Sequence, residues 1–119
     1  MEFYICENCG NIITHLKESG VPIMCCGEVM KELIPGQNGA PEKHIPLIVL
    51  NKDNVIIRIS HPMTEEHYIQ WIIIETTKGY QYAKLSWEDA PIAEFKLTED
   101  EEFIAAHEYC NLHGLWTSK

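Results

Sequence analysis

The stretch Ile45-Pro46-Leu47-Ile48-Val49-Leu50-Asn51-Lys52-Asp53-Asn54-Val55-Ile56-Ile57-Arg58-Ile59 indicates the fold class. It contains two short apolar runs, Ile45 to Leu50 and Val55 to Ile59, rich in the β-branched residues that favour extended backbone. The four residues between the runs carry side chains that suit a tight turn. We therefore expect a β-hairpin at this position.

Three later segments also have the composition of strands, namely Tyr68–Thr76, Tyr80–Leu85 and Ile92–Leu97. The first is rich in isoleucine, and Lys78-Gly79 supplies a turn into the second, so these two form a second expected hairpin. The third alternates apolar and charged residues, as a strand with one buried face does. Strands at this spacing predict an all-β protein with a β-sandwich.

The segment Thr98-Glu99-Asp100-Glu101 has two interpretations. Its threonine and glutamate have the spacing of a helical capping box. In an all-β context an acidic connection agrees better with its neighbours. We therefore expect a loop here, followed by one last strand from Phe103 to Tyr109.

A domain boundary is expected at Ile34-Pro35-Gly36-Gln37-Asn38-Gly39-Ala40-Pro41, because two prolines and two glycines interrupt regular structure. Four of the five cysteines precede it, and five of the six histidines follow it. We expect residues 1–35 to form one domain and residues 36–119 another, each with its own site.

The N-terminal segment is shorter than the roughly 40 residues below which a chain usually needs a metal, disulfide or partner to fold. Its cysteines lie in Cys6-Glu7-Asn8-Cys9-Gly10 and in Cys25-Cys26-Gly27. Four thiolates suit zinc or iron. A structural zinc site and a disulfide are the alternatives, but most zinc ribbons repeat C-x2-C in both halves, whereas here the second pair is adjacent.

Composition limits the partners and the compartment. Nine Lys and Arg residues against 18 Asp and Glu residues give a net charge of −9, which repels nucleic acid and anionic membranes. No apolar run approaches the ~18 residues of a membrane span, and Met1-Glu2-Phe3-Tyr4 does not resemble a signal peptide. We expect a cytosolic protein, where cysteines are metal ligands or redox groups more often than disulfides.

A second group of metal-ligand residues follows the boundary, at strand ends and in loops, where sites are usually built. Its members are His44, His61, His67, Cys110 and His113. A single histidine in such a protein is more often a surface or satisfied core residue, which is how we interpret His15 and His107. The three tryptophans, Trp71, Trp87 and Trp116, are most simply core aromatics.

These motifs resemble those of the desulfoferrodoxins, the two-iron class of superoxide reductases. Glu42-Lys43-His44, His61-Pro62-x4-His67 and Cys110-x2-His113 match the catalytic motifs of that family. The two cysteine pairs match its desulforedoxin-like Fe(Cys)4 centre. The resemblance implies an immunoglobulin-like β-sandwich, two irons per chain, and one-electron reduction of superoxide to hydrogen peroxide without release of oxygen.

The same resemblance implies roles for individual residues. Nε2 of His44, His61 and His67 and Nδ1 of His113 would bind the catalytic iron, with the Cys110 thiolate as a further ligand. Lys43 would attract superoxide, and Glu42 would close the remaining ligand position of ferric iron. We also expect backbone N–H groups after Cys110 to donate to its sulfur. The family pairs as a homodimer and takes electrons from rubredoxin-like donors.

Three other functions stay open. A pure two-iron electron carrier would have a ferrous centre already filled by protein ligands. A zinc-stabilised sandwich that binds a protein partner would be colourless. A superoxide dismutase would evolve oxygen, and the thiolate ligand argues against it because it makes the ferric state a poor oxidant.

Overall fold

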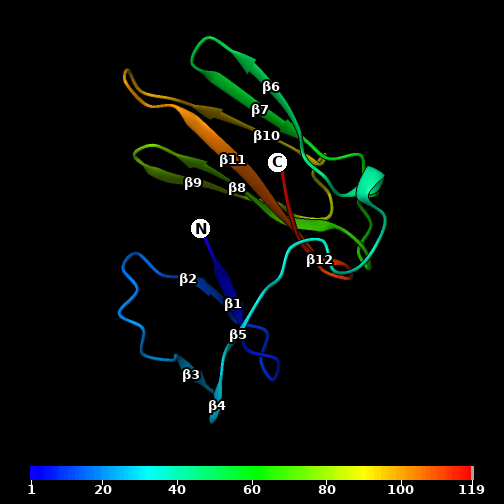
Figure 1. Cartoon of the computed structure of the whole chain (residues 1–119). Helices are drawn as coiled ribbons and strands as arrows, with labels where there is room; N and C mark the ends of the chain where they lie inside the picture. The colour runs from blue at the N-terminus through cyan, green and yellow to red at the C-terminus, as the bar shows by residue number, and fades with distance from the viewer. Residues whose placement is uncertain (119) are drawn as a thin grey trace. The chain divides into compact units, whose positions relative to one another are not determined.

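The structure, a computed structural model, describes residues 1–118 (Figure 1). The chain forms two compact units, Met1–Ile34 and the remainder from Pro35 onward. Regular structure in both consists of β-strands, apart from one short 3-10 helix, η1, at Pro41–Lys43. The all-β prediction is confirmed. Among residues 1–118, no helix has the length and apolar character needed to cross a membrane.

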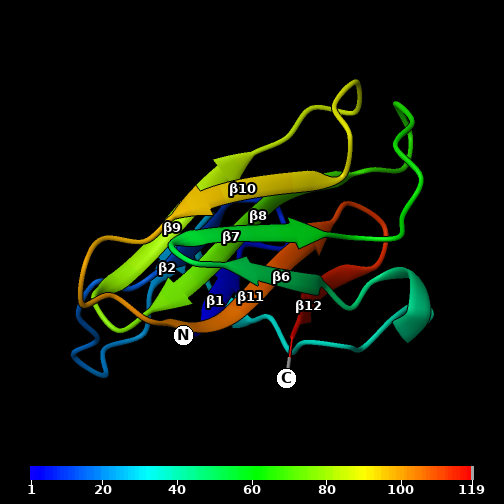
Figure 2. The same cartoon turned by 90° about the horizontal axis from the view of Figure 1, so that it is seen from above.

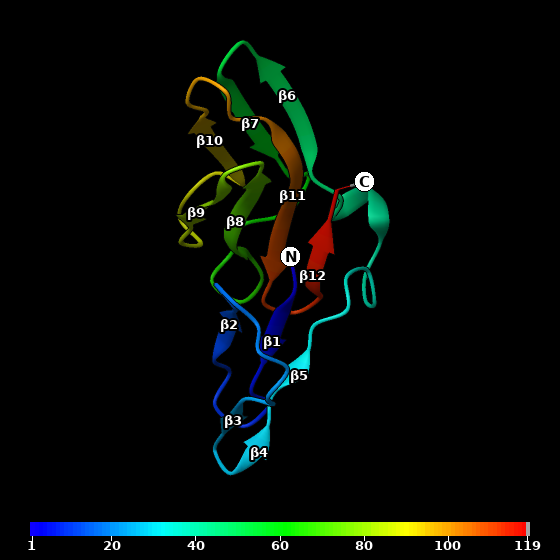
Figure 3. The same cartoon turned by 60° about the vertical axis from the view of Figure 1, so that its left-hand side comes forward.

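The first unit is a small arrangement of short strands. Strand β1 (Phe3–Ile5) lies between β2 (Ile12–Thr14) and β5 (Lys31–Glu32), antiparallel to both (Figure 3). Strands β3 (Met24–Cys25) and β4 (Glu28–Val29) form a separate hairpin. The buried apolar side chains of the first unit, among the described residues, are Phe3, Cys6 and Met30. So small a core needs an additional constraint, and the cysteines are the available one.

The second unit contains two antiparallel sheets. One has the order β10-β7-β6 and the other the order β12-β11-β8-β9 (Figure 2). The strands are β6 (Leu47–Asn51), β7 (Asn54–Arg58), β8 (Ile69–Thr76), β9 (Gly79–Lys84), β10 (Ile92–Lys96), β11 (Phe103–Cys110) and β12 (Gly114–Thr117). This is the expected β-sandwich.

Both predicted hairpins are confirmed. Strands β6 and β7 pair from Leu47↔Arg58 to Asn51↔Asn54 around a turn in which Lys52 has φ +59°. Strands β8 and β9 pair as far as Thr76↔Gly79. Gly79 has φ +141°, a conformation that glycine adopts without strain.

The core between the sheets leads directly to the cysteine near the C-terminus. Ile57 of β7, Ile72 of β8 and Ala106 of β11 are each 0% exposed and belong to one apolar cluster. Cys110 belongs to the same cluster and is also 0% exposed. The last residue of β11 is therefore fixed by the packing of the whole sandwich.

The end of the chain differs from the prediction of one last strand. Strand β11 continues to Cys110, and β12 pairs back along it from Cys110↔Gly114 to His107↔Thr117. The four residues of β12 are too few to show a strand pattern in the sequence. Their hairpin encloses the turn that carries His113.

The expected loop at 98–101 is present and keeps part of the capping-box bonding without a helix. Thr98 N–H donates to Glu101 Oε1 at 2.9 Å, and Glu101 N–H donates to the Thr98 carbonyl at 3.1 Å. The prediction of a loop is therefore confirmed, and the capping-box spacing accounts for the Thr98–Glu101 hydrogen bond within it. Trp87 is 40% exposed, so the prediction that it is a core aromatic is wrong, whereas Trp71 and Trp116 are buried.

The proline- and glycine-rich segment after Pro35 is packed within the second unit. Gly36 N–H donates to the Leu115 carbonyl at 2.9 Å. Trp116 Nε1 donates to the Asn38 carbonyl at 3.1 Å. These bonds hold the segment beside β12 and lead it into η1, which carries Glu42 and Lys43.

We predict that Ile57→Ala destabilises the second unit by about 2–5 kcal/mol, because it removes fully buried carbon atoms and leaves a cavity. Ile104→Ala is the control, since Ile104 is 52% exposed, and we expect a loss below about 1 kcal/mol. Urea unfolding followed by tryptophan fluorescence measures both, because all three tryptophans lie after residue 35. Equal losses would contradict this description of the core.

Candidate metal centres

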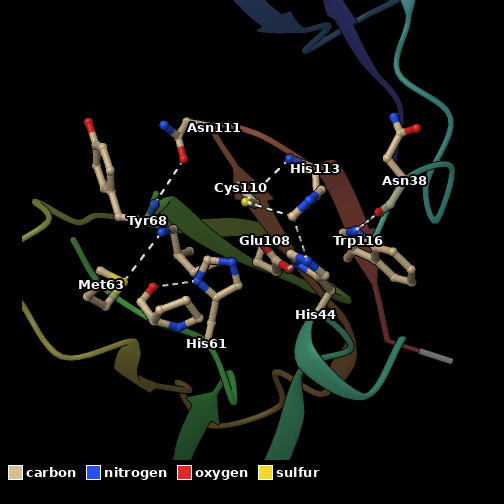
Figure 4. Close-up of polar contacts among 12 residues, drawn as sticks. Asn38, His44, His61, Met63, Tyr68, Glu108, Cys110, Asn111, His113 and Trp116 are labelled. Atoms are coloured by element: carbon tan, nitrogen blue, oxygen red, sulfur yellow. Dashed lines mark hydrogen bonds and ion pairs between the residues drawn. The ribbon is translucent and has the colours of Figure 1, made fainter. Parts of the chain in front are cut away.

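Five side chains from three segments of the second unit gather near the end of β11. Figure 4 shows four of them, His44, His61, Cys110 and His113. His44 directly follows η1, and its N–H donates to the Pro41 carbonyl at 3.0 Å. His61 and His67 lie between β7 and β8. Cys110 ends β11, and His113 lies in the turn before β12. All five lie at strand ends or in loops, as predicted.

Four of these side chains form a tight group. Ligand atoms of His44, His61, Cys110 and His113 all lie within 4.8 Å of one another. His113 Nδ1 is 3.1 Å from His44 Nε2 and 3.8 Å from Cys110 Sγ. These separations suit four ligands of one ion.

His67 lies beside this group and outside its 4.8 Å limit. Its ring centroid is 4.5 Å from that of His61 and 5.0 Å from that of His113. Its Nε2 is buried and has no hydrogen-bond partner within the described chain. The fifth side chain is thus adjacent to the group, with an unsatisfied nitrogen.

The histidines fit a bound metal ion. Within residues 1–118, Nε2 of His61 and Nε2 of His67 are both buried without a partner, which is costly unless something else satisfies them. His61 Nδ1 contacts the Pro62 carbonyl at 2.6 Å, and His44 Nδ1 contacts Glu108 Oε2 at 3.4 Å. Both contacts leave Nε2 available. Imidazoles with one thiolate suit iron, copper or zinc.

Burial favours the neutral, metal-binding form of His44, His61 and His67. Burial is the largest cause that lowers the pKa of His44, to about 4, and neighbouring histidines lower it further. Burial also lowers the pKa values of His61 and His67. The Lys43 ammonium contributes to lowering all three pKa values, so its charge acts on this cluster.

The sulfur of Cys110 is enclosed and hydrogen-bonded by the turn that follows it. Burial raises the pKa of this thiol, while the backbone N–H groups of Leu112 and His113 lower it. His113 N–H donates to Cys110 Sγ at 3.4 Å. The predicted backbone donors are therefore confirmed. They favour the thiolate, which is the form that binds metal.

Glu108 is a residue of this site that sequence reasoning missed. It is 0% exposed and precedes Cys110 by two positions, which puts both on the same face of β11. Burial raises its pKa to about 9. Since His44 and Glu108 are then both neutral, we describe their 3.4 Å contact as a hydrogen bond and not as an ion pair. The sequence could have indicated this residue, because alternation along the strand that ends at Cys110 places Glu108 on the core-facing side.

Trp116 fixes His44 from the other side. The two rings stack with centroids 5.1 Å apart and an interplanar angle of 12°. Because the indole N–H is bonded to the Asn38 carbonyl, the tryptophan cannot easily turn away. His44 thus has a carboxyl group on one nitrogen and an aromatic ring against its face.

The first unit holds a separate cluster of four thiols. The sulfur atoms of Cys6, Cys9, Cys25 and Cys26 all lie within 4.8 Å of one another. Gly10 N–H donates to the Cys6 carbonyl at 2.8 Å, which closes the turn between the first two cysteines. Gly10 has φ +87° and Cys26 has φ +53°. A left-handed cysteine is unusual and is maintained here by the turn that presents the adjacent pair.

The thiols cannot all ionise without a cation. The backbone N–H of Cys9 is the largest cause that lowers the pKa of Cys6, to about 6. Bonds from Cys6 and Cys9 raise the pKa of Cys26 to about 12. Four thiolates at this separation repel one another, and a bound metal ion removes that repulsion. The cluster therefore fits a tetrathiolate metal site.

The remaining predicted residues are placed as follows. Glu42 and Lys43 are exposed on η1, directly before His44. His107 is a buried core histidine, with Nδ1 2.9 Å from Thr117 Oγ1 and Nε2 3.2 Å from Glu75 Oε1. His15 packs edge-on against Tyr4 at 5.2 Å. Neither of these two histidines belongs to a metal-ligand group in the described chain.

Fold and sites together define a β-sandwich metalloprotein with a histidine–cysteine centre and a separate tetrathiol centre. A family model described as Desulfoferrodoxin matches residues 37–119. A desulfoferrodoxin of Nitratidesulfovibrio vulgaris (strain Hildenborough) is 42% identical over 123 residues, covering 99% of this chain and 95% of that protein. The chain belongs to the desulfoferrodoxin family.

Two solved structures are similar to this chain. The superoxide reductase from Treponema pallidum has a TM-score of 0.82 and 34% identity, with 100% of both chains covered. A superoxide reductase (1Fe-SOR) from Giardia intestinalis has a TM-score of 0.56 and 33% identity, covering 65% of this chain and 95% of that chain. Both units therefore have a counterpart in the first structure.

We predict that Glu108→Gln removes a pH dependence from the stability of the metal-free protein. The pKa of Glu108 is higher in the folded state than in the unfolded state, so its contribution is complete below about pH 4.5 and decreases as pH rises toward 9. The slope is up to about 1.4 kcal/mol per pH unit. Urea unfolding at pH 5, 7 and 8.5 measures it. Parallel pH profiles of wild type and variant would show that the buried group is already ionised.

Proposed function

We propose that the chain is a superoxide reductase, which reduces superoxide by one electron to hydrogen peroxide. The balanced reaction takes one superoxide, one electron and two protons, and it releases no oxygen. The observation that carries this proposal is the group of imidazoles around the buried sulfur of Cys110, with two buried nitrogens that lack a partner in the described chain. Membership of the desulfoferrodoxin family supports it.

The ligands of the two irons follow from the two clusters. His44, His61, His67, Cys110 and His113 would hold the catalytic iron, and Cys6, Cys9, Cys25 and Cys26 would hold the second iron. When bound in its ferrous form, the catalytic iron supplies the electron to superoxide. The protein's own part is to lower the pKa values of His44, His61 and His67, to donate the His113 backbone N–H to the Cys110 sulfur, and to fix His44.

Lys43 attracts the anionic substrate. The chain has a net charge of −9, so its overall field opposes superoxide. Charges farther away than about 8 Å are largely screened at physiological salt, so a near ammonium counts more than distant carboxylates. Lys43 is exposed, and its charge already depresses the pKa values of three site histidines. It therefore raises the local concentration of superoxide at this cluster.

Glu42 completes the site after electron transfer. Its carboxylate precedes Lys43 on η1 and is exposed. We assign this carboxylate as a further ligand of the oxidised metal, and in that role it would favour departure of the product. The protons come from solvent, which reaches η1 directly.

The first unit, the electron donor and the assembly complete the proposal. We propose that the Fe(Cys)4 centre relays electrons or stabilises its unit, and that a rubredoxin-like protein reduces the enzyme. We further propose a cytosolic homodimer. Cytosolic reducing conditions agree with the five free thiols of the described chain.

The test is metal analysis combined with superoxide addition to the reduced protein. We expect two irons per chain, a red Fe(Cys)4 chromophore, a blue-green ferric-thiolate band on oxidation, and peroxide formed without oxygen. Oxygen evolution would indicate a dismutase, and absence of peroxide would indicate an electron carrier. A colourless zinc protein that is still inert after iron reconstitution would leave only a binding module.

We predict that Lys43→Ala slows the second-order reaction with superoxide roughly 3- to 10-fold at low ionic strength and flattens its salt dependence. Pulse radiolysis over a range of salt concentrations measures both. Lys96→Ala is the charge-matched control, because Lys96 pairs with Asn54 at the far end of β7 from His61. Equal rates and salt slopes in the two variants would contradict a steering role.

A further inference from the structure

Asn111 lies between the two C-terminal site residues, and its side chain makes two hydrogen bonds to a different segment. The Tyr68 N–H donates to Asn111 Oδ1 at 2.9 Å (Figure 4). Asn111 Nδ2 donates to the Glu66 carbonyl at 2.9 Å. Both partners are backbone groups, and they lie on either side of His67 in the sequence.

The other side-chain hydrogen bonds of the segment that carries His67 lie within that segment. The Thr64 hydroxyl donates to the His67 carbonyl at 3.3 Å and accepts from the His67 N–H at 3.1 Å, and the Ile69 N–H donates to Met63 Sδ at 3.4 Å. Thr64 and His67 exchange backbone hydrogen bonds of 2.9 and 3.1 Å, which close a short turn. Strand pairing begins only at Ile69 of β8. His67 lies outside the tight group of ligand atoms. The position of its backbone therefore affects whether its buried Nε2 can bind the same ion as the other four side chains.

We propose that Asn111 is a positioning residue, which ties the His67 segment to the Cys110–His113 turn and sets His67 against the other four ligands. This inference rests on the proposed function, because it concerns the iron held by the same five side chains. It deepens that proposal by naming what holds the most loosely grouped ligand in place.

The chemistry of the side chain supports this role. One carboxamide provides an acceptor and a donor on the same planar group, and here it accepts from one side of His67 and donates to the other. The backbone N–H of Asn111 donates to the Tyr68 carbonyl at 3.2 Å, and this bond remains after side-chain truncation. Truncation of the Asn111 side chain therefore removes its two hydrogen bonds to Glu66 and Tyr68 and leaves the β11–β8 pairing intact.

The test compares iron-loaded wild type with Asn111→Ala and with a matched control, Gln81→Ala. Gln81 also donates a side-chain amide bond to a backbone carbonyl, that of Lys96, at 2.9 Å, in a part of the sandwich away from the cluster. The readouts are the rate of iron loss to a ferrous chelator and the visible band of the oxidised catalytic centre. The Fe(Cys)4 centre in the same chain is an internal reference.

We expect Asn111→Ala to lose catalytic iron about 10- to 100-fold faster than wild type, with a shifted band, as second-shell changes typically do. The Fe(Cys)4 centre and the Gln81→Ala protein should be unchanged. If the alanine variant does not fold, Asn111→Asp takes its place. It keeps the acceptor for Tyr68 N–H and loses the donor to the Glu66 carbonyl, so we expect it to accelerate iron loss by less than the alanine variant would.

A second background decides whether Asn111 acts through His67. In His67→Ala protein, adding Asn111→Ala should cause no further acceleration, since the ligand that it positions is already absent. An equal acceleration in both backgrounds, or unchanged iron loss in Asn111→Ala, would overturn the inference while leaving the proposed function in place. Failure of the wild type itself to hold iron in the second unit would overturn both.

Discussion

The structure of each unit depends on a cluster of metal-ligand side chains that needs a bound cation. In the second unit, burial lowers the pKa values of His44, His61 and His67, and Nε2 of His61 and of His67 has no partner in the described chain. In the first unit, four sulfur atoms lie close enough to disfavour ionisation of all four together. Unsatisfied buried groups destabilise the folded state. Metal binding satisfies them, and because the site forms only in the folded state, its binding free energy stabilises that state. Each unit is therefore complete only with an ion in it.

The sandwich supplies the precision that the second cluster requires. Cys110 is both the end of β11 and a member of the apolar core, so its sulfur moves only if the sheets move. His113 is held by the β11–β12 hairpin, and His44 by the stacked Trp116 ring and the Glu108 carboxyl group. The ligands come from loops, but each loop is anchored to the core within a few residues. This arrangement combines anchored ligands with exposed charged residues on η1, directly before His44.

The sequence predicted what depends on local pattern and missed what depends on tertiary packing. Alternation and turn residues located both hairpins, and spacing located the cysteine and histidine groups. Strand β12 was missed because it has four residues and is stabilised by pairing with β11, not by its own composition. The exposure of Trp87 could not be predicted either, since burial of an aromatic in a loop depends on what lies opposite. Glu108 was within reach, because its position two residues before Cys110 fixes its face, but an acid on a core-facing strand contradicts the usual preference.

The protonation states explain why imidazoles, and not carboxylates, surround a site for an anionic substrate. With neutral histidines and one thiolate, the ligand set carries a charge of about −1, so a divalent ion leaves the centre with about +1. Carboxylate ligands would make the centre negative and would repel superoxide. Burial works in the same direction at Glu108, since a pKa of about 9 keeps that group uncharged near neutral pH in the absence of metal. Desolvation lowers the histidine pKa values and raises that of the glutamate, so both kinds of group are uncharged near neutral pH within a chain of net charge −9.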